Sequence, residues 1–224
     1  MSIIFIVLTI CSYGQNKNRF PIWTFHEKNV NIQGISVGFW SSLISGRNTN
    51  TNGIRLELIG FGVFAPMAPQ FPEFGNQRSE RVNGLSLSAL GTVCDCLING
   101  LSAGLGQITY QVNGISVVPF MNITQKHNGI MLSGFNVSDT MNGLQLGFNN
   151  GSSKTNGVQI AFLINETEEM KGLQIGLFNN SKNLRGIQIG LWNVNQKRKL
   201  PLINWNFKRA AKKNKTLSEK QITQ

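Results

Sequence analysis

A glycine that returns at near-constant spacing is the feature that most constrains the fold of this 224-residue chain. From Gly84 onward the motif recurs every 14 to 16 residues, and two looser copies precede it. A period this short cannot hold a helical hairpin or a βαβ unit, so each copy must consist of strands and turns. The motif glycines are Gly34, Gly53, Gly84, Gly100, Gly114, Gly129, Gly143, Gly157, Gly172 and Gly186.

Apolar and polar residues alternate after each late glycine. Residues 172–177 read Gly-Leu-Gln-Ile-Gly-Leu, and residues 186–191 read Gly-Ile-Gln-Ile-Gly-Leu. A period of two is typical of a half-buried β-strand, so we expect Ile175 and Ile189 to face the interior. The polar residues would then form an outward stripe, or an amide ladder that serves the fold alone. These candidate interaction residues are Gln145, Gln159, Gln174 and Gln188.

Two corners interrupt the alternation in each copy. Pairs such as Asn142-Gly143 break the strand parity, and this dipeptide tolerates the positive φ that a sharp corner requires. A second corner lies at polar runs such as 149–151 and 179–181. Each copy therefore reads as strand, corner, short strand, corner.

This pattern predicts an all-β fold, namely a β-solenoid of about ten coils of 14–15 residues with a Pro-rich insertion. Like residues of successive coils would lie over one another at ~4.8 Å. The alternative is an antiparallel β-meander or an outer-membrane β-barrel, in which each copy is one strand. The alternation covers only about six residues per copy, whereas barrel strands need ~9–11, so the solenoid is favoured.

The repeats define a single β-repeat domain, residues 15–207, interrupted by an insertion near residues 60–80. Several prolines in the insertion disfavour strand pairing there. We expect the insertion to cover the end or the side of the solenoid. The alternative is a binding loop that exposes Phe64, Met67, Phe71 and Phe74.

The first residues predict export. An apolar run, Ile3–Ile10, precedes small residues at Ser12 and Gly14, which is the pattern of a signal peptide with its cleavage site. We therefore expect residues 1–14 to be a signal peptide. The mature chain would be exported to the cell surface, the outer membrane or the periplasm.

Two cysteines, Cys94 and Cys96, would remain after such cleavage. Export permits disulfides, but a bridge between residues i and i+2 needs a strained loop, so we expect two unbridged packing cysteines. A metal site would require two further ligands, and His26 and His127 stand apart in the sequence. The sequence therefore predicts no metal and no cofactor.

The formal charge of +11 is concentrated near the C-terminus. Residues 197–220 hold 9 of the 21 basic residues, and we expect residues 208–224 to form a basic, disordered tail. Secretion argues against nucleic acid as a partner. The expected partners are an unknown protein or glycan and, through the tail, an anionic envelope surface. The tail cations considered for that contact are Lys208, Arg209, Lys212 and Lys213.

The chain is not expected to be an enzyme. Glu166, Glu168 and Glu169 are its densest group of carboxylates, but they fall at a corner where a solvated acidic loop is the ordinary choice. General acid–base catalysis needs positioned carboxylates or histidines close together, and neither histidine has a repeated partner. The sequence thus predicts no catalytic residue.

The units NGLQLGFNN, KGLQIGLFNNSKN and RGIQIGLWNVNQKRKLPLINWNF, with the segment GTVCDCLINGLSAG, resemble an uncharacterised bacterial surface-repeat family of spirochaetes and Bacteroidota. The resemblance covers roughly residues 32–207 and implies exported or surface placement, without a known reaction or catalytic residue. The expected function is a non-catalytic exported repeat protein, a structural or interaction scaffold at the cell envelope. The alternatives are a small outer-membrane barrel and the binding of anionic surfaces through the tail.

Overall fold

The structure is a computed structural model. The predicted signal peptide, residues 1–14, and the predicted tail, residues 208–224, lie outside the residues that it describes, as does Phe71. The described residues are 16–41, 47–67, 74 and 78–207.

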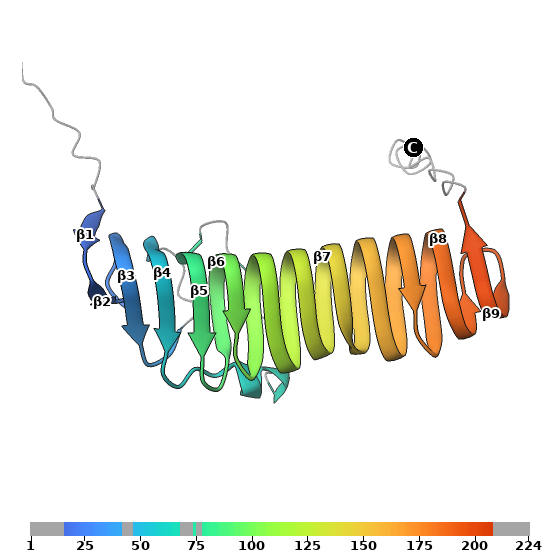
Figure 1. Cartoon of the computed structure of the whole chain (residues 1–224), viewed down its shortest axis with the longest axis horizontal. Helices are drawn as coiled ribbons and strands as arrows, with labels where there is room; N and C mark the ends of the chain where they lie inside the picture. Colours follow the sequence, from blue (N-terminus) through green and yellow to red (C-terminus); the bar gives the residue numbers. More distant parts are fainter. Residues whose placement is uncertain (1–15, 42–46, 68–73, 75–77, 208–224) are drawn as a thin grey trace, which may run out of the picture. The chain divides into compact units, whose positions relative to one another are not determined.

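The fold is all β, a β-solenoid of about ten turns, which confirms the prediction (Figure 1). The chain divides into two compact units, residues 1–134 and residues 135–224. The long strand β7 winds continuously through several coils. The elements are β1 (Lys17–Arg19), β2 (Ile22–Thr24), β3 (Val30–Gly38), β4 (Thr49–Glu57), the 3-10 helix η1 (Gly62–Met67), β5 (Glu80–Ser88), β6 (Thr92–Ala103), β7 (Gly106–Ile175), β8 (Phe178–Val194) and β9 (Lys199–Asn206).

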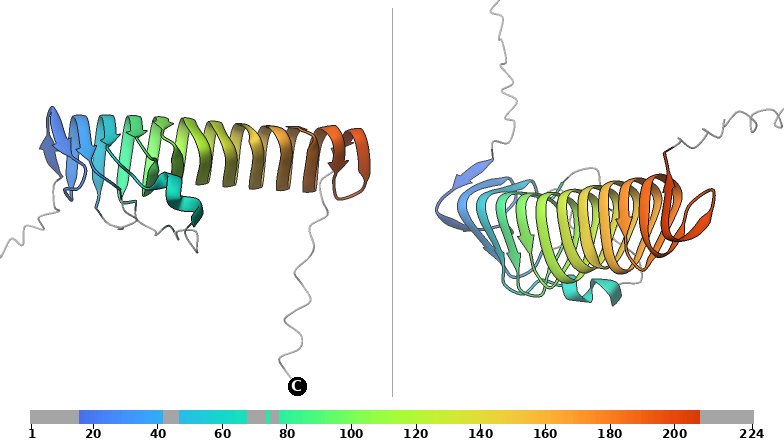
Figure 2. Two further views of the ribbon diagram at one scale, coloured as in Figure 1. Left: turned by 90° about the horizontal axis from the view of Figure 1, so that it is seen from below. Right: turned by 45° about the vertical axis from the view of Figure 1, so that its right-hand side comes forward.

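In the first unit, successive coils pair in parallel with like residues side by side. The motif glycines of β3, β4, β5, β6 and the start of β7 are direct partners across the sheet. β4 and β5 keep this register although the insertion separates them in the sequence, because the insertion leaves the coil and returns to it. The winding of these coils can be followed in Figure 2.

In the second unit, the end of β7 pairs in parallel with β8, with Gly172 opposite Gly186. β9 then reverses and pairs antiparallel with β8, placing Trp205 beside Ile187. The alternative of an antiparallel meander or barrel is therefore wrong, because neighbouring copies run in the same direction as stacked coils.

The motif glycines allow this stacking, as Gly172 illustrates. Its φ is +133°, a conformation that residues with a side chain rarely adopt. A methyl group added there would lie 2.9 Å from the carbonyl carbon of Gly157 in the preceding coil, and closer still to its oxygen. The near-constant glycine period is thus a backbone requirement of the corner.

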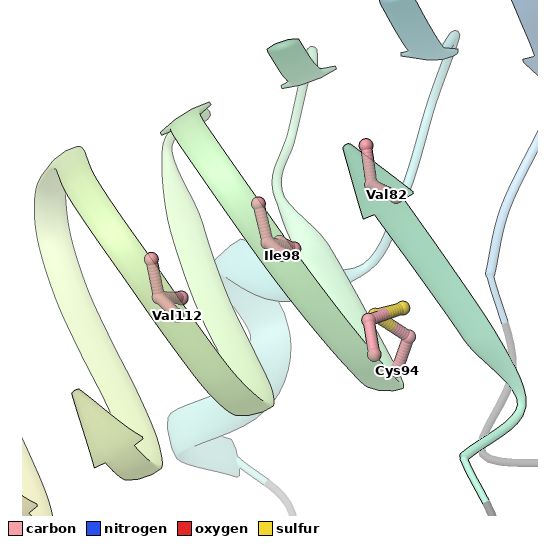
Figure 3. Packing of buried hydrophobic residues seen from close by; sticks show 5 residues of the cluster. Val82, Cys94, Ile98 and Val112 are labelled. Carbon is pink, nitrogen blue, oxygen red and sulfur yellow. A yellow bond between two sulfur atoms is a disulfide. The ribbon is translucent and has the colours of Figure 1, made fainter. Parts of the chain in front are cut away.

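The interior contains one apolar row and several polar rows. The apolar row lies two residues before the motif glycines. Its members are buried and mostly apolar, with Thr51, His127 and Thr155 as polar exceptions. In the first unit these residues pack with the buried cysteines, as Figure 3 shows for Val82, Ile98 and Val112. In the second unit the row continues with Met141, Thr155, Met170 and Leu184.

The predicted inward positions are wrong. Ile175 is half-buried and Ile189 is 41% exposed. The residues directly before them, Gln174 and Gln188, are fully buried. The strand alternates as predicted, but its two faces are exchanged. Amides stacked in register bond to one another inside the coil, which removes the usual cost of burying them.

Part of the insertion covers the side of the first unit. Phe74 packs against Ile108 and Ile123, and its ring lies edge-on to that of Tyr110 at 5.8 Å between centroids. This agrees with the expected cover. Phe64 and Met67 are exposed.

Cys94 and Cys96 form a disulfide, so the expectation of unbridged cysteines is wrong. The register between β6 and β7 shifts between Cys94 and Leu97, and this bulge supplies the local distortion that a bridge between residues i and i+2 requires. Asp95, between the two cysteines, is buried and paired with Arg78.

Candidate interaction surface

The four candidate glutamines form a ladder inside the second unit rather than a stripe on its surface. The amide nitrogen Nε2 of Gln159 donates to Oε1 of Gln145 at 2.7 Å, and Gln174 donates likewise to Gln159 at 2.8 Å. Gln188 continues the ladder to Gln174 at 2.8 Å. All four side chains are buried, so the predicted outward stripe is wrong and the ladder serves the fold.

A second buried ladder runs through the other corner of the same coils. Asn165 donates to Oδ1 of Asn179 at 2.8 Å, and Asn179 donates to Asn193 at 2.7 Å. Asn165 also donates to the backbone carbonyl of Ile175 at 2.8 Å, which ties the corner to the strand. The sequence placed these residues at corners but not in a ladder. The missed signal is an asparagine that recurs seven or eight residues after each motif glycine from Gly114 onward.

With amides inside, the apolar residues of the strands lie outside. In the second unit they form two adjacent rows, at the first and third positions after each motif glycine. β9 extends both rows, because Trp205 pairs with Ile187 and Ile203 pairs with Ile189. We call this the outer apolar face; it consists of Leu144, Leu146, Val158, Ile160, Leu173, Ile175, Ile187, Ile189, Ile203 and Trp205.

Aromatic side chains border the outer apolar face where the strands reach the second corner. Phe162 is 66% exposed, and its ring lies edge-on to Phe148 with 5.5 Å between centroids. In the next coils Phe178, which pairs with Ile164, and Trp192 lie close to the second corner and are also exposed. The first unit carries equivalent exposed rows of its own, which include Ile54, Leu101, Ile115 and Val117.

Two residues of the acidic trio, Glu166 and Glu168, lie on the opposite side of the second unit. Thr167 donates to Oε1 of Gln159 across the coil interior at 2.7 Å, so the neighbours of these two residues point outward in opposite directions. Glu166 and Glu168 therefore face away from Ile160. They line a groove of polar residues, in which Glu168 bonds Lys182 at 2.6 Å and the pKa of Glu168 is lowered by that bond.

The first unit buries a cluster of charges that the sequence did not reveal. Arg55 stands at the position that a glutamine occupies in later coils, and it bonds Glu80 at 2.8 Å and Glu57 at 3.4 Å. Burial alone would raise the pKa of Glu57, but Arg55 and hydrogen bonds from Ser41 and Thr92 hold it below its usual value. These charged side chains are bonded to one another inside the coil.

His127 is also buried in the first unit. Its Nε2 atom lies 2.8 Å from the hydroxyl of Ser116, which in turn accepts a hydrogen bond from Asn122 at 2.7 Å. Burial lowers the pKa of His127 to about 4. The imidazole is therefore neutral in the folded protein near pH 7.

We expect His127 to make the protein less stable in acid. Its pKa is lower in the folded chain than in the unfolded one, so the unfolded state binds more protons between pH 4 and 6.5. The free energy of unfolding should fall by about 1.4 kcal/mol per pH unit across this window, and level off at lower pH as far as this group is concerned. Urea titrations at several pH values measure this slope.

The His127→Gln variant provides the test, because glutamine cannot be protonated. It should lose most of that slope. Burial also lowers the pKa of His26, but this residue is exposed, so the same change there should remove a smaller part of the slope. Equal slopes in the wild type and in His127→Gln would contradict the assignment.

Within the described ranges, no three His, Cys, Asp or Glu side chains gather as metal ligands. No helix in the part of the chain that the structure covers has the length and apolar character needed to cross a bilayer. Lys208, Arg209, Lys212 and Lys213 lie outside the described residues.

Comparisons of the chain with family models, with curated proteins and with solved structures gave no match.

Proposed function

We propose that this chain is a non-catalytic, exported repeat protein that acts as an interaction scaffold at the cell envelope. The observation that carries the proposal is the outer apolar face of the second unit. Contiguous apolar surfaces of this kind on a folded protein mark sites of protein or membrane interaction.

The fold gives little reason for the apolar character of this face. The coils of the second unit are held by the glutamine and asparagine ladders, the backbone ladder and the buried row that includes Met170 and Leu184. Ile160, Ile187 and Ile189 keep 36–41% of their surface exposed, so a substantial apolar area is left in water by the fold. Polar β-branched residues would form the same strands, and a binding role accounts for the residues present.

Three observations support export. The Cys94–Cys96 disulfide is favoured in oxidising compartments such as the periplasm and the cell exterior. The sequence of residues 1–14 has the pattern of a signal peptide. The repeat units also resemble a bacterial surface-repeat family.

The non-catalytic part of the proposal is supported by the way that the reactive side chains are used. Arg55, Glu57 and Glu80 bond to one another inside the coil, and His127 is bonded to Ser116. Glu168 is exposed and paired with Lys182. These groups stabilise coils or face solvent instead of converging on one substrate position.

Cell fractionation tests this function. The full chain with an epitope tag should be recovered with the envelope, and alkylation before reduction should leave Cys94 and Cys96 unlabelled. Recovery in the cytosol with both thiols labelled would overturn the proposal. A tagged cytosolic protein and a tagged envelope protein serve as fractionation controls.

A further inference from the structure

We propose that the outer apolar face of the second unit docks onto an anionic lipid bilayer. This inference rests on the proposed function and names the partner of the scaffold. Three features carry it: an apolar sheet face with aromatic residues beside it, cations next to that face with no acidic side chain among its described residues, and the point at which the basic sequence begins.

The face has the composition of a membrane-contacting surface. Its rows are aliphatic across the coils, and it ends in Trp205 on β9. Exposed aromatic side chains lie toward the second corner of the same coils, namely Phe148, Phe162, Phe178 and Trp192. Tryptophan is favoured where an apolar region meets polar headgroups, because its ring is apolar and its N–H is a hydrogen-bond donor.

Cations line the opposite border of the face. The residue before each motif glycine is asparagine in most coils, and Asn156 donates to Asn142 at 2.9 Å in this external row. Lys171 and Arg185 replace asparagine in the last two coils, and they are neighbours in the register. The external amide ladder therefore does not continue into these coils, and two exposed positive charges take its place. The fold does not require positive charges at these positions.

Acidic side chains are absent from the outer apolar face and from this row of the second unit, as far as the structure describes it. Glu166 and Glu168 lie on the other side of the coil, next to Lys182. At the end of the face, Arg198 lies over the ring of Trp205 at 4.4 Å from its centroid. The side that carries the apolar rows is thus complementary to an anionic surface.

The basic sequence begins where the face ends. Phe207, which is exposed, directly follows β9, and residues 208–224 contain six basic residues and one acidic residue. Stable binding to membranes commonly combines an apolar contact with a polybasic segment. Lysine and arginine side chains near an anionic leaflet are attracted to it, so this segment strengthens docking of the adjoining face.

The size of the face favours lipid over a second copy of the chain. The face spans five neighbouring strands spaced ~4.8 Å apart, and about six residues along each strand at a rise of ~3.3 Å per residue. Its area is therefore roughly 500 Å². A stable protein–protein interface needs about 800 Å² from each partner. Binding to a bilayer requires no such minimum contact area, because each apolar or charged contact adds to the binding free energy.

Vesicle flotation of the full chain tests the proposal. The probes are vesicles of phosphatidylglycerol and phosphatidylcholine in equal parts, with pure phosphatidylcholine vesicles for comparison. The wild type should float with the anionic vesicles, and added salt should weaken the binding. The variant Ile160→Thr/Ile189→Thr should lower the partition coefficient on the order of tenfold, because threonine keeps the strand but removes apolar contact.

Val137→Thr is the matched control. Val137 is 39% exposed, close to the 41% of Ile189, but it lines the polar groove on the other side of the unit. This variant should bind as the wild type does. Circular dichroism should show the same β content in all variants, since threonine has a high strand propensity.

The other outcomes overturn the inference in distinguishable ways. If the double variant binds normally while deletion of residues 208–224 abolishes binding, the tail alone contacts the lipid. If the chain binds neither kind of vesicle but light scattering shows dimers, the face binds a second copy of the chain. In both cases recovery in the envelope fraction would leave the scaffold function standing, whereas cytosolic recovery would remove it.

Discussion

Replacing Gly172 with alanine is expected to destabilise the second unit by about 3 kcal/mol or more. The backbone at Gly172 has a φ of +133°, where a Cβ atom is strained whatever the space around it. The added methyl group would also overlap with the carbonyl oxygen of Gly157 in the preceding coil. That oxygen belongs to stacked backbone, so the coils must separate to make room.

Gly151→Ala is the matched control in the same unit. An added methyl group there would lie 3.8 Å from the carbonyl oxygen of Asn136, an ordinary contact, and the φ of Gly151 is not in the strained region. Urea unfolding followed by circular dichroism gives both free energies. We expect Gly151→Ala to lie within about 0.5 kcal/mol of the wild type. A similar loss in the free energy of unfolding for both variants would contradict the backbone explanation of the glycine period.

Replacing Gln174 with glutamate is expected to cost about 3 kcal/mol at neutral pH. Gln174 donates to Oε1 of Gln159 and accepts from Nε2 of Gln188, both at 2.8 Å. A carboxylate would still accept from Gln188 but would turn a second acceptor toward Gln159. A buried charge without a cationic partner would then face the carbonyl oxygen of Gln159 inside the coil.

The loss should depend on pH in a direction opposite to that of His127. Burial and the facing oxygen raise the pKa of the introduced carboxyl group in the folded chain above its unfolded value of about 4.3. The protonated carboxyl can donate to Gln159, so the destabilisation should be largest above the folded pKa and shrink as the pH falls through it.

Gln125→Glu provides the control, because Gln125 is exposed and the same change there should be nearly neutral. Denaturant midpoints of both variants at neutral and acidic pH, each referred to the wild type at the same pH, give the comparison. A Gln174→Glu variant as stable as Gln125→Glu at neutral pH would contradict the buried ladder.

The two ladders also explain why a glutamine-rich coil tolerates an apolar exterior. Each buried amide of Gln159 and Gln174 meets the same group one coil away, so the polar atoms are satisfied without water. The outer apolar face is then available for binding, because residues such as Ile187 and Ile189 are not needed to fill the interior.

The sequence by itself determined the repeat, the corners and the solenoid. Steric limits act locally: the conformation at a residue such as Gly172 excludes other side chains, and the short period excludes helices. The stacking of like residues follows from that period, so the parallel register of Gly172 with Gly186 was predictable.

Only the tertiary structure decided which side of each strand is inside. A period of two marks two faces but does not label them, and the usual rule that apolar residues are buried placed Ile175 and Ile189 in the interior. That rule fails here because the coils stack in register, so Gln174 finds its partners in the neighbouring coils rather than in its own sequence. The Cys94–Cys96 bridge and the charge cluster around Arg55 likewise depend on contacts and backbone distortions that the alternation of residue types does not encode.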